Sequence, residues 1–229
     1  MDKLLGFSPD ADPTTPGVIT ACTNFIPYET GMTGAPSGST PASTPVLAAA
    51  CVGAVVVTKL DDTRRILAGT ATKLYELSGG AWSDVTRAGD YTGGVDTRWS
   101  YTQFGNATIA SNLSDTMQRS ESGAFADIAT APKAKIVFSV GSFVMALNTS
   151  DATYGVSQNR WWCSATFSDT SWTPNVTALC ATGMLVSAPG QLTAGGKLGD
   201  YAVAYKDKAI FLGQFVGAPS VWDWAQVPG

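Results

Sequence analysis

The amino-acid sequence predicts an all-β protein whose main body is a β-propeller. The chain of 229 residues holds 20 Ser and 27 Thr but only three Glu, so helix-forming residues are scarce. From about residue 54, short β-branched and aromatic runs alternate with Gly, Asn, Asp and Ser in a strand-and-turn rhythm. A similar unit then recurs four times along this part of the chain.

Residues 1–45 differ from the rest and predict an extended N-terminal docking arm ahead of a body at 46–229. Seven of the 12 prolines lie in this segment, and each proline pushes the preceding residue toward an extended backbone. The arm also carries apolar side chains that a purely solvated linker would not need. We therefore expect it to contact the body or a neighbouring subunit. The candidate contact residues are Pro13, Pro16, Val18, Ile19, Phe25, Ile26 and Tyr28.

Within the body, four short segments ending in Ala align with one another. They are residues 65–68, 107–110, 143–146 and 201–204. Gly105, Gly141 and Gly199, each followed by a small polar residue, precede the last three segments and predict tight hairpin turns. A second apolar or aromatic strand follows each segment, so every repeat contains at least one hairpin.

Each repeat closes on an aromatic residue, namely Trp82, Phe125, Trp172 and Trp222. These residues are 43, 47 and 50 positions apart, which is the repeat length of four-stranded propeller blades. We expect each aromatic ring to fill the wedge between neighbouring blades, because one blade cannot bury both of its faces alone. The predicted blades cover residues 54–88, 98–130, 134–177 and 190–229.

Two alternatives to this propeller stay open. Short strands with Gly turns produce chance self-similarity, so a Greek-key sandwich is the second prediction for the fold. Four blades are few for a closed ring. Either the ring is a small four-bladed one, or further blades come from a missing C-terminal portion or from another chain.

The composition excludes many enzyme classes. The sequence has no His, which rules out Ser-His-Asp and Cys-His nucleophile pairs and His-ligated metals. Catalysis by two carboxylates, as in glycosidases, is still possible, but most Asp residues lie beside Gly, Thr or Ser in predicted turns. Asp169 is only three residues before Trp172, so the Asp-box of sialidase propellers is not matched. We therefore expect no catalytic residues.

No metal site and no cofactor site is expected either. Cys22, Cys51, Cys163 and Cys180 lack ligand spacing and are interpreted as ordinary buried thiols. The glycine pairs lack the context of a phosphate-binding loop. The net charge of -4 argues against a basic cradle for nucleic acid. No cleavable signal segment is expected, and the longest apolar run, 12 residues at 46–57, is too short to cross a bilayer.

Six stretches together resemble a known family. They are PDADPTTPGVITACTNFIPYETGMTGAPSG in the arm, then RILAGTATKLYELSGGAW, RWSYTQFGN, APKAKIVFSVGSFVMALN, RWWCSATFSDTSWTP and VWDWAQVPG in the body. The combination resembles the propeller-bearing tail proteins of short-tailed bacteriophages (podoviruses), of the tail nozzle, hub or packaged-DNA-stabilisation type. The resemblance spans nearly the whole chain.

The resemblance implies a structural virion protein that is made in the host cytoplasm and carries no catalytic residues. Such a subunit assembles into a homo-oligomeric ring, commonly a hexamer, below the portal and its adaptor, and contacts other tail proteins. It retains packaged DNA and forms the channel for DNA ejection without sequence-specific binding. Members of the family are longer than 229 residues, so C-terminal blades or tip domains are expected to be missing here.

A low, slightly acidic charge fits such a duct, because a wall poor in cations lets the duplex slide. The alternative function is a carbohydrate-binding propeller for host receptor recognition, with Trp residues as the platform. A glycosidase that works with carboxylates alone is the third hypothesis.

Overall fold

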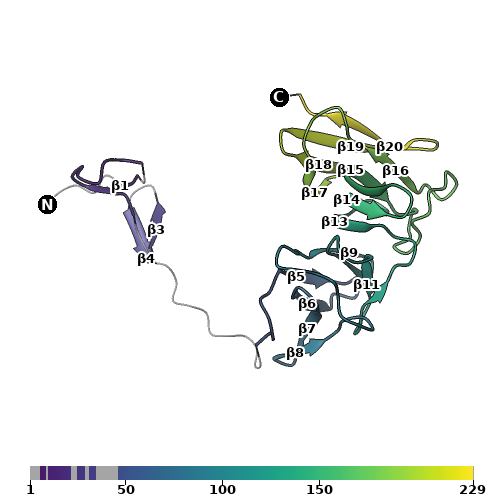
Figure 1. Cartoon of the computed structure of the whole chain (residues 1–229), viewed down its shortest axis with the longest axis horizontal. Coiled ribbons are helices and arrows are strands. Elements are labelled where there is room, and N and C mark those ends of the chain that lie inside the picture. The colour runs from purple at the N-terminus through teal and green to yellow at the C-terminus, as the bar shows by residue number, and fades with distance from the viewer. Residues whose placement is uncertain (1–5, 9, 22–24, 29–30, 35–45, 229) are drawn as a thin grey trace. The chain divides into compact units, whose positions relative to one another are not determined.

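The computed structural model describes residues 6–8, 10–21, 25–28, 31–34 and 46–228. Every regular element among these residues is a β-strand (Figure 1). The chain divides into two compact units, Met1–Ala42 and Ser43–Gly229. Each unit is described by itself.

The N-terminal unit contains two small sheets. In the first, β1 (Gly6–Phe7) pairs in parallel with β2 (Val18–Ile19), and in the second, β3 (Phe25–Tyr28) and β4 (Gly31–Gly34) form an antiparallel pair. Pro13 and Pro16 are exposed between β1 and β2, and both residues of β2 are half-buried. The side chains of Phe25, Ile26 and Tyr28 lie outside the described part of the structure, so the docking role of this segment stays a prediction.

The body consists of four antiparallel sheets of four strands each, and the strands of every sheet follow chain order. We number these sheets as blades 1 to 4. Blade 1 comprises β5 (Gly53–Thr58), β6 (Arg64–Gly69), β7 (Leu74–Ser78) and β8 (Ala81–Asp84). Blade 2 comprises β9 (Ser100–Phe104), β10 (Ala107–Ser111), β11 (Gln118–Ser120) and β12 (Ala126–Asp127).

Blades 3 and 4 have longer strands than blades 1 and 2. Blade 3 comprises β13 (Lys133–Val140), β14 (Phe143–Asp151), β15 (Gly155–Cys163) and β16 (Ala181–Met184). Blade 4 comprises β17 (Leu192–Leu198), β18 (Tyr201–Lys206), β19 (Ala209–Gly217) and β20 (Val221–Gln226). The last strand of blade 3 lies beyond the predicted limit at residue 177, because the connection between β15 and β16 takes up residues 164–180.

The prediction of an all-β protein built on propeller blades is confirmed. The four aligned segments of the sequence fall in the second strand of each blade, that is in β6, β10, β14 and β18. The first strands of successive blades contact one another, with β9 against β5 and β13, and β13 against β17. The blades thus follow one another from the blue blade 1 to the yellow blade 4 (Figure 1).

Gly105, Gly141 and Gly199 each open a two-residue hairpin turn between the first and second strands of a blade. Their φ angles are +59°, +54° and +59°, in the left-handed region where a side chain costs energy. A positive φ at the first turn residue is typical of the type II′ turn, whose twist matches that of the flanking strands. The sequence pair Gly plus small polar residue thus corresponds to a real turn in blades 2, 3 and 4.

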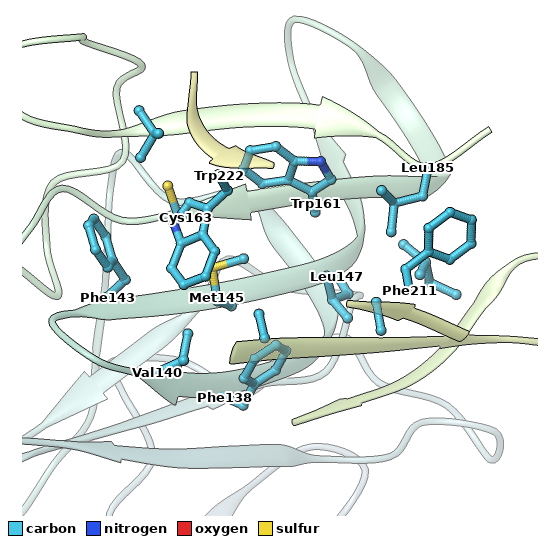
Figure 2. Close-up of a cluster of buried hydrophobic side chains, with 14 of the residues drawn as sticks. Phe138, Val140, Phe143, Met145, Leu147, Trp161, Cys163, Leu185, Phe211 and Trp222 are labelled. Atoms are coloured by element: carbon cyan, nitrogen blue, oxygen red, sulfur yellow. The ribbon is translucent and has the colours of Figure 1, made fainter. Parts of the chain in front are cut away.

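Side chains on each second strand alternate between the two faces of the blade. In β14, Phe143, Met145 and Leu147 belong to the core shared with blade 4, whereas Val144 and Ala146 belong to the core shared with blade 2. This follows from the period of two along a strand. The body therefore has three cores, one at each junction between blades, and Figure 2 shows the core between blades 3 and 4.

Candidate functional site

Three of the four predicted blade aromatics lie at successive junctions between blades, which we call joints 1–2, 2–3 and 3–4. Phe125 is buried in the core of joint 1–2, Trp172 in that of joint 2–3 and Trp222 in that of joint 3–4. Trp82 is half-buried on β8. Trp172 differs from the others in position, because it lies in the loop between β15 and β16 rather than next to the outer strand of its blade.

Joint 1–2 is held by a buried arginine on β6. The Nε and Nη2 atoms of Arg65 donate to the two carboxylate oxygens of Glu76 on β7, at 2.7 and 2.9 Å. The same guanidinium donates to the backbone oxygens of Ser120 and Gly123 in blade 2, at 3.1 and 3.4 Å. Its carbon lies 5.7 Å from the centre of the Phe125 ring. One side chain that is 5% exposed thus connects both blades.

A second polar network at this joint centres on Asp115, which is 6% exposed. Its carboxylate accepts hydrogen bonds from Arg87, from the Asn112 amide and from both the backbone and the hydroxyl of Thr92. Arg87 also pairs with Asp127 of β12 at 3.0 Å. The segment that follows blade 1 is therefore fastened to blade 2 by charge-assisted hydrogen bonds.

The third contact at joint 1–2 is the close packing of the Trp99 ring against the backbone of β6. The indole Nε1 of Trp99 donates to the carbonyl oxygen of Thr70 at 2.8 Å, and the ring lies against Gly69. A Cβ atom on Gly69 would lie 2.2 Å from Cδ1 of Trp99, so only glycine fits this position.

Joint 2–3 is closed by a loop that reaches back from blade 3. Trp172 is completely buried, and its Nε1 donates to the carbonyl oxygen of Asp169 at 3.0 Å. The Asp169 carboxylate accepts a hydrogen bond from Arg119 of β11 at 2.6 Å. Thr130, which follows β12, donates to the Thr170 carbonyl at 2.8 Å. The loop 164–180 therefore holds blade 3 against blade 2.

Joint 3–4 is rich in aromatic side chains. Trp161 belongs to its core, while the adjacent Trp162 belongs to that of joint 2–3, so the two indoles pack on opposite faces of blade 3. Phe143 packs edge-on against Trp222 with ring centres 5.6 Å apart (Figure 2). Lys206 of β18 donates to the carbonyl oxygens of Leu185 and Ala188 in the segment between the blades.

Several of the other carboxylates act in turns. Asp12 accepts hydrogen bonds from the backbone and hydroxyl of Thr14, and Asp61 accepts them from the hydroxyl and backbone of Thr63. These bonds lower the pKa of both carboxyl groups, which is the opposite of what a proton donor needs. Among the described residues, no group of three His, Cys, Asp or Glu side chains could hold a metal ion.

The buried thiols are unreactive by environment. Burial raises the pKa of Cys163 to about 12 and that of Cys180 to about 11, so both stay protonated at neutral pH. The interpretation as a buried thiol is wrong for Cys51, which is exposed, and Cys22 lies outside the described residues.

A surface hollow lies beside joint 2–3. It has a volume of about 580 Å³ and is lined among others by Thr130, Lys133, Asp151, Trp162 and Trp172. The two indoles are only 6% and 0% exposed, so neither presents a ring face for a sugar to stack on. None of the described residues forms a helix long and apolar enough to span a membrane.

The sequence did not reveal the cations at the joints. Arg65, Arg87, Arg119 and Lys206 each bond to a neighbouring blade or to the segment leading into one, yet they are scattered along the chain. The repeat alignment gave one indication of these contacts, because Arg65 is the first residue of the aligned segment 65–68. Thr70, Asn112, Asn148 and Lys206 also share one place, two residues after the aligned Ala, and all four are buried.

The chain matches no family model, and no curated protein matches it. Among solved structures, it is similar to YCF48 from Cyanidioschyzon merolae, with 13% sequence identity and a TM-score of 0.33. The similarity covers 80% of this chain and 74% of that chain. At this level it says nothing about function.

Proposed function

We propose that this chain is a structural subunit of the tail of a short-tailed bacteriophage, a nozzle or hub protein that works in several copies. Its copies form a ring below the portal and adaptor, retain the packaged DNA and surround its exit path. The chain acts as no enzyme in this role and needs no cofactor.

The observation that carries the proposal is the division into a small N-terminal unit and a larger body of blades. A body whose three joints are closed by buried aromatic and cationic side chains is a stiff element. A separate segment with apolar residues before it suits a contact with another subunit. The resemblance of the sequence to phage tail proteins gives this architecture its specific context.

The contacts of six of the 14 Lys and Arg side chains support a role that does not include DNA binding. Lys59, Arg65, Lys73, Arg87 and Arg119 all form ion pairs with carboxylates of the same chain. Lys206 is occupied by backbone carbonyls. Cations held in this way are not available to phosphates, whose binding needs clustered free Lys and Arg.

The experiment that tests the proposal removes the N-terminal segment from the particle that contains this chain. We expect a chain without residues 1–45 to fold its blades, as judged by circular dichroism, and to be absent from purified tails. A second variant keeps the segment's length and replaces Phe25, Ile26 and Tyr28 by Ser; it should be lost from tails as well. Deleted chains that still enter tails and support DNA retention would contradict the proposal.

The carbohydrate-binding alternative lacks an observation in its favour. It needs exposed Trp rings, whereas five of the seven Trp side chains are at most 6% exposed and Trp82 and Trp224 are half-buried.

A further inference from the structure

The two terminal blades each have one face that contacts no other blade among the described residues. We call the side of blade 1 that points away from blade 2 the start face, and the side of blade 4 that points away from blade 3 the end face. The alternation along the second strands identifies them. In blade 1, Leu67 faces blade 2 and Ile66 points away; in blade 4, Ala202 and Ala204 face blade 3 and Val203 points away.

Apolar side chains of the start face come from all four strands of blade 1. Val56 of β5 pairs with Ile66 of β6, and Leu77 of β7 pairs with Trp82 of β8. The pair Thr58 and Arg64 follows at the end of β5 and β6. Val56 is 61% exposed and Ile66 39% exposed. Contiguous apolar side chains on a sheet face are typical of an interaction surface rather than of free solvent-facing sheet.

The end face is apolar in the same way and is hollowed. Val203 pairs with Leu212 and Tyr205 pairs with Ile210 across β18 and β19, while Leu198 at the end of β17 is 64% exposed. A groove of about 320 Å³ lies beside these side chains, and Gly196 of β17 leaves it open, since a Cβ there would meet nothing within 4 Å. The face thus offers room for apolar side chains from outside.

We propose that the end face of one copy packs on the start face of a second copy, and that two copies close one propeller. In each of the three joints within the chain, the face of one blade that points toward the C-terminal blades packs on the opposite face of the next blade. The end face of blade 4 and the start face of blade 1 are the same two kinds of face without a partner. A second copy can therefore repeat a contact that the chain already makes three times. A two-fold pair uses all four open faces and leaves none exposed.

The closed assembly would have eight blades, four from each copy, which lies within the usual range of about four to eight for propellers. The inference goes beyond the proposed function and does not rest on it, since it concerns only the surfaces of the blades.

Sedimentation velocity on the 229-residue chain tests this inference, with one charge introduced on each face. We expect the unaltered chain to be a dimer, and Val56→Asp and Leu198→Asp to weaken association by at least about 100-fold each, because a charge would be buried unpaired in the joint. Both side chains are mostly exposed in the single chain, so these variants should keep their thermal stability. Val95→Asp and Val156→Asp are the matched controls, at side chains 88% and 75% exposed outside both faces, and should stay dimeric.

Three results would overturn the inference. A monomeric unaltered chain would mean that the faces are covered otherwise, for instance by residues 1–45. A dimer lost in only one of the two variants would mean that like faces meet. Larger assemblies that both variants abolish would exclude closure with eight blades. Each result would leave the proposed tail function to its own test, which measures incorporation into particles.

Discussion

Replacing Arg65 by Met is expected to destabilise the body by about 3 kcal/mol, which is the cost of leaving one partner of a buried ion pair alone. The substitution removes both hydrogen bonds to Glu76 and those to the backbone of Ser120 and Gly123. Met fills most of the volume, so the loss reports on charge and hydrogen bonds. Urea denaturation followed by Trp fluorescence measures the change in the free energy of unfolding.

The adjacent arginine provides the control for this prediction. Arg64 is exposed on the same strand, and Arg64→Met should change the free energy of unfolding by less than about 0.5 kcal/mol. Arg65→Lys should lose most of the same stability, because an ammonium group cannot reproduce the two-pronged contact with Glu76. Equal stabilities of the Arg65 and Arg64 variants would show that the guanidinium does not fasten joint 1–2.

Trp172→Ala is expected to destabilise the body by about 3–5 kcal/mol, the range for truncating a buried Trp. The indole is completely buried in joint 2–3 and anchors the loop 164–180 on blade 2. Its loss should open the contact of Asp169 with Arg119 as well. Thermal unfolding should show a lower midpoint, and hydrogen exchange should show faster exchange in β11 and in the loop.

Phe167→Ala is the matched control, since Phe167 lies in the same loop and is 84% exposed. It should change the stability by less than about 1 kcal/mol. If both variants unfold at the temperature of the unaltered chain, the loop 164–180 does not stabilise joint 2–3.

The blade pattern could be predicted from the sequence because each second strand repeats a short apolar segment after a Gly turn. The segments 107–110, 143–146 and 201–204 correspond to β10, β14 and β18, and the turns at Gly105, Gly141 and Gly199 have the backbone that the sequence pair requires. Local patterns of this kind depend on few residues and survive in a single sequence.

The joints could not be predicted in the same way, because they depend on contacts between distant residues. Arg65 meets Gly123, 58 positions later, and Arg119 meets Asp169, 50 positions later. Trp172 was expected to close a blade, but a loop of residues 164–180 carries it back to the preceding blade. The strand β16 was not predicted, because it follows this long connection and its short sequence, Ala181–Met184, has few strand-forming residues.

The open faces of blades 1 and 4 follow from the alternation of side chains along each strand, but the sequence alone did not predict them. Apolar residues such as Val56, Ile66 and Ile210 look like ordinary core residues until the structure places them on an unpaired side. The position of the charges also differs from the cation-poor wall expected for a duct. The first strands, where the blades meet, carry Lys133, Lys135 and Lys197, so the net negative charge does not lie along them.

Electron cryomicroscopy of the tail of the particle that contains this chain tests its role as a tail subunit. We expect density for the four blades, repeated around the tail axis below the portal and adaptor, with residues 1–45 in contact with a neighbouring subunit. Blade density located away from the tail, or tails that lack this chain altogether, would contradict it.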